Sequence, residues 1–153
     1  MLLHRQDEDR LGRLQDRLRD ISAVTPDLVH DVLAEGGFDG DGQGTEQARR
    51  IDALMGWDAW VEVALAVLGL ELPEWTVRRL VREDGEWHCT LSRNAELPAC
   101  IDPTAEGSHQ VLPLAILAAS LAARRLPTES SLPAAPTWFP PEAGWPMCCD
   151  DFA

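Results

Sequence analysis

The segment that most constrains the fold is a pair of alternating runs between Trp75 and Arg93, separated by Glu83-Asp84-Gly85. Apolar and polar residues alternate on both sides of this turn, which is the period of a half-buried β-strand. An Asp-Gly pair between two such runs is typical of a hairpin. The sequence therefore predicts an antiparallel β-hairpin with one buried face.

Two loop lengths are compatible with this hairpin. A two-residue Asp84-Gly85 loop would place Val81 opposite His88, whereas a three-residue loop with a left-handed Gly85 would place Val81 opposite Trp87. We favour the three-residue loop, because a one-residue slip exchanges the faces and this register separates apolar from charged side chains more cleanly. Its apolar face would carry Trp75, Val77, Val81, Trp87, Cys89 and Leu91.

The polar face of the hairpin is a candidate anion-binding surface. In the favoured register it carries Arg78, Arg82 and His88. Each guanidinium offers a planar fork for carboxylates or phosphates. The alternative is that these cations meet the protein's own acidic helices or solvent, where ion pairs contribute little.

An N-terminal helix is predicted over Arg5 to Ile21, where Leu11, Leu14, Leu18 and Ile21 recur at three and four residues. Two heptads are too short for an independent coiled coil. The stripe of Leu11, Leu14 and Leu18 is therefore either docked on the protein's own body or a partner-binding surface, including that of a homodimer.

Caps and prolines predict four further helices. Thr25 caps a helix that begins at Pro26, and Thr45 caps Glu46 to Met55. Asp58 caps Ala59 to Leu68, which Gly69 ends. Pro113 lies in the first turn of a helix that runs to about Arg125. Because two strands alone are marginal, we expect either a third strand near Leu97 to Ile101 or pairing of the hairpin with another subunit.

The predicted fold class is α+β: N-terminal helices and a β-hairpin, or a three-stranded antiparallel sheet, packed against apolar helices. The expected organisation is N-terminal helices over 1–35, a glycine-rich hinge over 36–44, a core over 45–126 and a tail over 127–153. The tail is rich in proline and tryptophan. Its Trp138, Phe139 and Trp145 would either anchor in a partner's pocket or fold back over the domain.

Residues 58–125 resemble known groups of proteins. The strings VEVALAVLGLELPEWTVRRLVREDGEWHCTLSRN and HQVLPLAILAASLAARR are similar to a group of small uncharacterised bacterial proteins. The alanine-rich second string also resembles the final helix of the phage ABA-sandwich domains. This resemblance implies an α–β–α sandwich and a phage or prophage setting, and it implies no functional residues.

Charge narrows the possible partners. The 153 residues carry 26 acids and 13 arginines, a formal charge of −13. Phosphates would be repelled, so direct nucleic-acid binding and anionic membranes are disfavoured, and basic protein surfaces remain. The start Met1-Leu2-Leu3-His4 lacks the apolar core of a secretion signal, and the sequence therefore predicts a cytoplasmic protein with reduced cysteines.

No metal, cofactor or catalytic motif is predicted. The loop Asp39 to Gly44 is similar to a calcium loop, but Arg50 stands where the closing glutamate belongs. His88, Cys89, Cys100 and His109 lack zinc-ligand spacing. No nucleophile, base and orienting group can be assembled, so we do not expect an enzyme.

Three functions remain open on sequence grounds. The first is a non-enzymatic accessory protein that binds a protein partner. The second is an inhibitor that imitates phosphates with its carboxylates. The third is a binder of small anions, or an enzyme, that uses the arginine-rich face of the hairpin.

Overall fold

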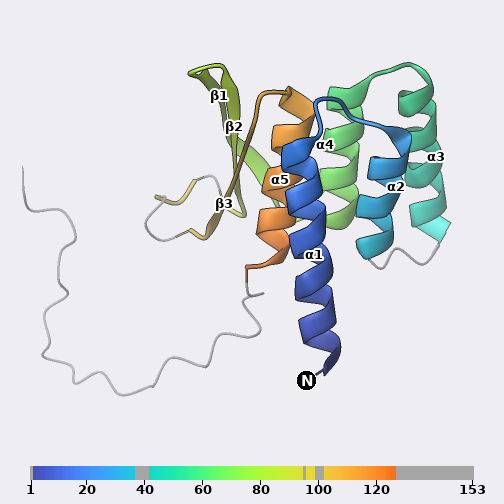
Figure 1. The fold of residues 1–153 in the computed structure, drawn as a ribbon, viewed down its shortest axis with the longest axis horizontal. Coiled ribbons are helices and arrows are strands. Elements are labelled where there is room, and N and C mark those ends of the chain that lie inside the picture. Colours follow the sequence, from blue (N-terminus) through green and yellow to red (C-terminus); the bar gives the residue numbers. More distant parts are fainter. Residues whose placement is uncertain (1, 37–41, 95, 99–101, 127–153) are drawn as a thin grey trace, which may run out of the picture.

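The computed structural model describes residues 2–36, 42–94, 96–98 and 102–126. Within these residues the chain forms an α+β fold of five helices and one three-stranded antiparallel sheet, as the sequence predicts (Figure 1). The elements are α1 (Leu2–Asp20), α2 (Pro26–Glu35), α3 (Gly42–Gly56), α4 (Trp60–Glu71), β1 (Thr76–Glu83), β2 (Glu86–Ser92), β3 (Thr104–His109) and α5 (Leu112–Arg124).

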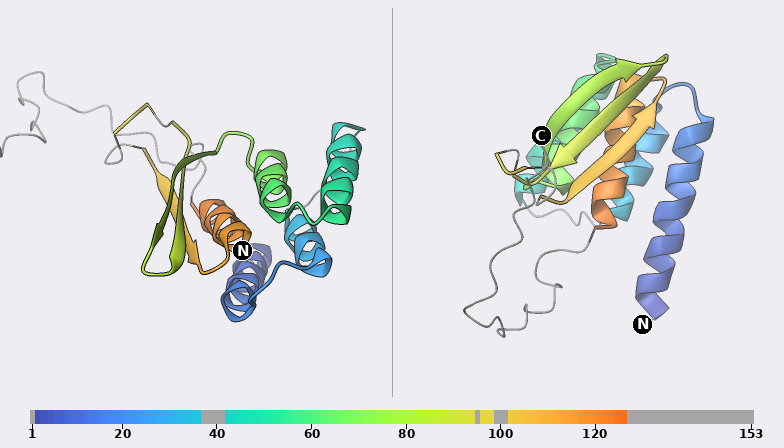
Figure 2. Two further views of the ribbon diagram at one scale, coloured as in Figure 1. Left: turned by 90° about the horizontal axis from the view of Figure 1, so that it is seen from above. Right: turned by 90° about the vertical axis from the view of Figure 1, so that its left-hand side faces the viewer.

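All the described helices lie on one side of the sheet (Figure 2). The strand order is β1-β2-β3, and α5 packs directly against β2 and β3. We call the sheet face turned to α5 the inner face and the opposite one the outer face. The second helical layer that an α–β–α sandwich requires is absent from the residues that the structure describes.

The hairpin closes with the shorter loop, so the predicted three-residue loop is wrong. Asp84 and Gly85 both have positive φ angles, 51° and 88°. Two left-handed residues form a type I′ turn, whose twist matches that of the strands. Val81 therefore lies opposite His88, and Arg82 lies opposite Trp87.

A β-bulge shifts the register by one residue farther from the turn. The pairing shifts between Val77 and Arg79, which leaves Arg78 as the extra residue. Because of this shift, Val77 lies opposite Leu91, as the favoured register requires. A bulge moves one strand by one residue relative to its partner. The two halves of the hairpin thus follow the two different registers that the sequence allowed.

The third strand lies later in the chain than predicted. It is Thr104–His109, whereas Leu97 and Pro98 lie in the connection and 99–101 fall outside the described residues. Gly107 explains how this polar segment joins the sheet. A Cβ at Gly107 would lie 2.8 Å from the Ala115 carbonyl oxygen and 2.7 Å from the Ala118 carbonyl carbon. The missing side chain lets β3 lie against the backbone of α5.

Of the three predicted helix caps, only Thr25 is confirmed. Helix α3 begins at Gly42, so Thr45 lies inside it, and residues 42–44 of the predicted hinge are helical. The Thr25 hydroxyl accepts a hydrogen bond from the Leu28 amide at 3.3 Å, and Pro26 begins α2. Asp58 does not cap α4, because its φ of 55° turns the chain and α4 begins only at Trp60. Helix α4 also continues past Gly69, since nothing after Gly69 breaks it before Leu72 and Pro73.

The N-terminal helices share one core with the other described helices and the sheet. Helix α1 contributes Leu14 and Leu18, which are 8% and 1% exposed. The cluster that they join contains Leu28, Val29, Val32, Ile51, Val63, Val67, Leu91, Leu114, Ile116, Leu117 and Leu121.

In the described ranges no helix is long and apolar enough to cross a bilayer.

A buried ion pair joins three helix ends. Arg124, near the end of α5, pairs with Glu71 at the end of α4, and their side chains are 11% and 3% exposed. The Arg124 guanidinium also donates to the Val32 carbonyl oxygen of α2 at 3.2 Å. Burial lowers the pKa of Arg124 to about 10, while the Glu35 carboxylate acts in the opposite direction.

Candidate functional site

The outer face of the sheet carries an ordered set of polar side chains. On the central strand β2, Thr90 lies between Arg79 of β1 and Glu106 of β3. One step nearer the loop, His88 lies between Val81 and Ser108. Side chains that face each other across strands interact directly. The three strands therefore hold these groups at fixed positions on one surface.

This surface is hollowed. A depression of about 250 Å³ is lined by residues of all three strands: Arg79, Val81, Glu83, His88, Cys89, Thr90, Glu106, Gly107 and Ser108. At one border the Arg79 guanidinium lies 3.2 Å from the Glu83 carboxylate, and both side chains are mostly exposed. The hollow is shallow and open, so it can take an extended segment lying along the sheet.

The chemistry of the hollow is that of hydrogen bonding. His88 and Ser108 place an imidazole opposite a hydroxyl, and Glu106 adds an acceptor. Cys89 is buried, and burial raises the pKa of its thiol from 9.0 to about 11, so the thiol is protonated at neutral pH and is a poor nucleophile. As the central strand, β2 directs its amides to both neighbouring strands.

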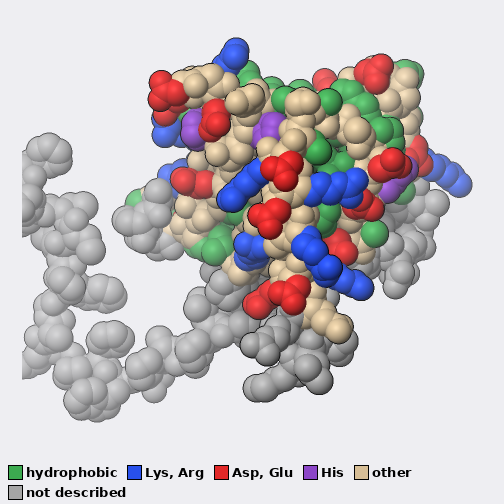
Figure 3. All heavy atoms as spheres, viewed as in Figure 1, with side chains coloured by type: hydrophobic (Ala, Val, Ile, Leu, Met, Phe, Trp, Pro, Cys, Tyr) green, Lys and Arg blue, Asp and Glu red, His purple; other side chains and the backbone are tan. Residues whose placement is uncertain are grey.

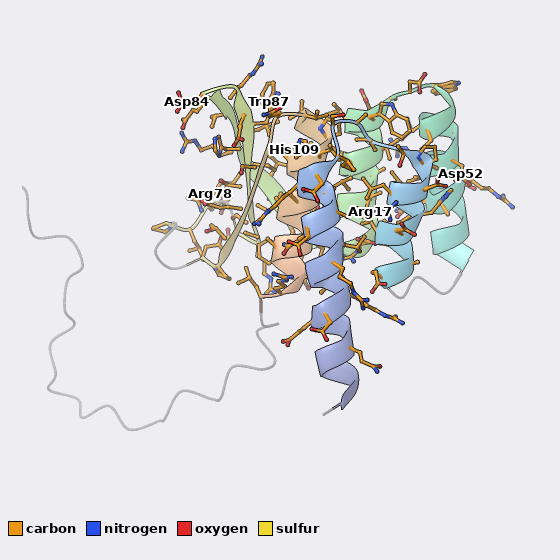
Figure 4. The ribbon with its side chains drawn as sticks, in the orientation of Figure 1. Arg17, Asp52, Arg78, Asp84, Trp87 and His109 are labelled. Atoms are coloured by element: carbon orange, nitrogen blue, oxygen red, sulfur yellow. The ribbon has the colours of Figure 1, made fainter. Side chains whose placement is uncertain are left out.

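The predicted cationic patch is divided between different environments, so the expectation that its three residues share one face is wrong. Arg82 lies opposite Trp87 on the inner face, with its guanidinium carbon 5.9 Å from the centre of the indole ring. His88 lies on the outer face. Arg78 occupies the bulge, and Figure 4 shows it far down the hairpin from Trp87. The physical reason is the type I′ loop, which exchanges the faces relative to the predicted register.

Arg78 serves the sheet itself. Its guanidinium lies 3.8 Å from the carboxylate of Asp102, whose side chain is 3% exposed. Asp102 also accepts hydrogen bonds from the Ser92 hydroxyl and from the Asn94 amide. Arg78 therefore helps to neutralise a buried carboxylate that ties the end of β2 to the approach to β3. Nearby, the Arg93 guanidinium lies 5.0 Å from the ring centre of Trp75.

The predicted partner-binding residues are placed as follows. Leu14 and Leu18 are buried and Leu11 is half-buried, so the leucine stripe of α1 docks on the protein's own body, the alternative that the sequence left open. The tail aromatics Trp138, Phe139 and Trp145 lie outside the described residues.

Sequence reasoning missed Glu106 and Ser108 because it did not predict β3. A signal was present, since Thr104, Glu106 and Ser108 alternate with the small residues Ala105 and Gly107. Small inward residues of this kind are what a strand needs in order to approach a helix closely. Within the described residues no group of three His, Cys, Asp or Glu side chains is placed to hold a metal ion.

Comparisons with known proteins add no assignment. No family model, no curated protein and no solved structure matches this chain. The resemblance to the phage domains therefore stays a prediction.

Proposed function

We propose that this chain is a non-enzymatic accessory protein that holds a polypeptide segment of a partner protein against the outer face of its sheet. The observation that carries the proposal is the hollowed outer face, over which no described helix lies. The hollow offers donors from Arg79, His88 and Ser108 and acceptors from Glu83 and Glu106. A polypeptide needs this mixture, because it presents both N–H and C=O groups.

A small anion fits the hollow less well than a polypeptide segment does. Glu106 and Glu83 border the same hollow, and Arg79 is already paired with Glu83. Carboxylates around the site would repel an anion and would accept hydrogen bonds from a partner's amides or cations. The charge of −13 likewise supports a partner whose own surface is basic.

Phosphate mimicry requires carboxylates that gather without cations. On the face shown in Figure 3, basic and acidic side chains alternate along α1. Two acids on the next two helices are also paired within the chain, Asp31 of α2 with Arg17 and Asp52 of α3 with His30. This mixing favours the accessory-protein hypothesis over the inhibitor. A cytoplasmic location and a phage-related role stay predictions.

The test compares two serine substitutions. Ser108→Arg fills the hollow from β3, whereas Ser22→Arg adds the same side chain to the exposed α1–α2 connection. A partner captured from the native host by the wild type is then purified and titrated against each variant by calorimetry. We expect Ser108→Arg to weaken binding by about tenfold or more and Ser22→Arg to leave it unchanged.

Circular dichroism spectra and unfolding curves must match the wild type for both variants. Equal affinity of the wild type and Ser108→Arg for every captured partner would refute the outer-face proposal. Loss of binding in both variants would refute it as well, because the effect would then not be specific to the hollow.

A further inference from the structure

Strand β1 forms an edge of the sheet. It pairs with β2 on one side, and no described strand pairs with it on the other. Leu80 on this strand is 37% exposed, which makes it one of few large apolar side chains at the surface of the described residues. An edge strand with exposed backbone groups is a template for pairing with another strand.

The type I′ loop determines which backbone groups point outward. The residues that flank a two-residue loop, here Glu83 and Glu86, exchange hydrogen bonds across the hairpin. Bonded and non-bonded pairs then alternate along an antiparallel ladder. It follows that Val81 bonds to β2, while Leu80 and Arg82 direct their N–H and C=O groups away from the sheet.

We propose that two copies of this chain associate through their β1 strands, antiparallel, about a two-fold axis that passes through Val81. The two sheets then form one continuous sheet with the helices of both copies on the same side. Leu80 of each copy lies opposite Arg82 of the second copy, and each such pair exchanges two backbone hydrogen bonds. The aliphatic part of the arginine covers the exposed leucine.

Charge selects this register. With the axis at Val81, Arg79 of each copy lies opposite Glu83 of the second copy, so opposite charges meet twice. Moving the axis to Leu80 would place Arg78 opposite Arg82, and moving it to Arg82 would place two Arg82 side chains together. Like charges directly opposite are destabilising, so both neighbouring registers are disfavoured.

Arg79 and Glu83, which pair with each other in one copy and with the second copy in the dimer, are exposed enough to exchange partners. Arg79 and Glu83 are 63% and 59% exposed and pair with each other along the strand at 3.2 Å. Beyond Arg79 the bulge interrupts the strand, which limits the pairing to a short segment. A two-fold contact of this kind closes on itself and does not propagate into fibres. Its small area suits a weak dimer, with a dissociation constant of about 10–1000 µM.

The first test measures self-association by sedimentation velocity over a concentration series. We expect Arg79→Glu to weaken the dimer by about tenfold or more, because carboxylates then face each other across the axis. Arg79→Glu combined with Glu83→Arg exchanges the two charges and is expected to restore the wild-type constant to within about threefold. Arg49→Glu, on exposed α3, changes the net charge equally and is the matched control, expected to leave the constant unchanged.

The second test fixes the register chemically. Because Val81 bonds to β2, the two Val81 residues at the axis form a non-bonded pair with Cα atoms about 4.5 Å apart, within the range of a disulfide. In a variant whose Cys100, Cys148 and Cys149 are serine, Val81→Cys should form a covalent dimer under mild oxidation, and Leu80→Cys should do so far more slowly.

Three outcomes overturn the proposal. One is a monomer at all concentrations up to about 1 mM, since 1 mM is the largest dissociation constant expected for this dimer. Another is a dimer that Arg79→Glu leaves unchanged, and the third is faster cross-linking at Leu80→Cys than at Val81→Cys. Arg79 and Glu83 also border the outer-face hollow, but the proposal for the hollow is tested separately, through Ser108 on β3.

Discussion

Replacing Gly107 by alanine tests the contact that positions the outer face. A Cβ there would lie 2.7 Å from the Ala118 carbonyl carbon and 2.8 Å from the Ala115 carbonyl oxygen. These are backbone atoms of α5, so no side chain can move aside to relieve the overlap. Either β3 or α5 must shift, and the strand that carries Glu106 and Ser108 shifts with them.

The expected cost follows from two opposing effects. Extra atoms in a closely packed core typically cost about 1–3 kcal/mol, and here the obstruction is backbone, which favours the upper part of that range. Replacing glycine also reduces the entropy of the unfolded chain, which returns about 0.4–1 kcal/mol. We therefore expect Gly107→Ala to lower the free energy of unfolding by about 1–2.5 kcal/mol. The Tm should fall by roughly 2–10 °C.

Urea unfolding followed by circular dichroism measures this loss. The control is Gly69→Ala on α4, where an added Cβ meets nothing within 4 Å. At that helical position alanine should stabilise the protein by up to about 1 kcal/mol. The same glycine-to-alanine change is thus expected to lower the free energy of unfolding at Gly107 and to raise it at Gly69. If Gly107→Ala unfolds within about 0.5 kcal/mol of the wild type, the close packing of β3 on α5 is refuted.

Three further predictions concern the core. Arg124→Met leaves the Glu71 carboxylate buried without its partner and should lower the free energy of unfolding in urea by about 3–5 kcal/mol. The double variant Arg124→Met with Glu71→Leu should recover most of this loss, and an equal loss in both variants would contradict the prediction. The raised pKa of Cys89, from 9.0 to about 11, stabilises the fold fully below pH 9, and this contribution is lost as the pH rises through 11. At pH 9.5, with the other cysteines replaced by serine, a thiol reagent should therefore label the native protein about tenfold or more slowly than the urea-unfolded one, and equal rates would contradict the burial. Leu18→Ala should cost about 2–5 kcal/mol and the half-buried Leu11→Ala clearly less, as unfolding curves would show; small and equal losses would mean that the α1 stripe is not docked.

Local signals predicted most of the elements correctly. Thr25 and Pro26 carry a complete helix start, because a hydroxyl acceptor and a fixed φ act within one turn of chain. The signal for α5, a proline in its first turn at Pro113, and the signal for the hairpin are equally local. Asp58 shows the limit of such signals, since aspartate favours both a helix cap and a left-handed turn, and the turn is the one adopted.

The candidate site depended on information that is not local. An Asp-Gly loop is compatible with two registers, and hydrophobic segregation favoured the wrong one for the residues next to the loop. The bulge at Arg78 reconciles that loop with the buried pair of Val77 and Leu91. Its arginine lies beside the buried Asp102, a residue that only the folded chain brings near. The loop and the bulge together explain why Arg78, Arg82 and His88 do not share one face.

The sequence by itself determined the alternating hairpin, the apolar helices and the acidic charge, because periodicity, turn chemistry and ionisation act over a few neighbouring residues. Only the tertiary structure decided that Thr104–His109 is a strand, that the leucine stripe of α1 is covered, and that all the described helices lie on one side of the sheet. Those outcomes depend on which surfaces approach closely enough to exclude water. In this chain, a glycine against the backbone of α5 makes that approach possible.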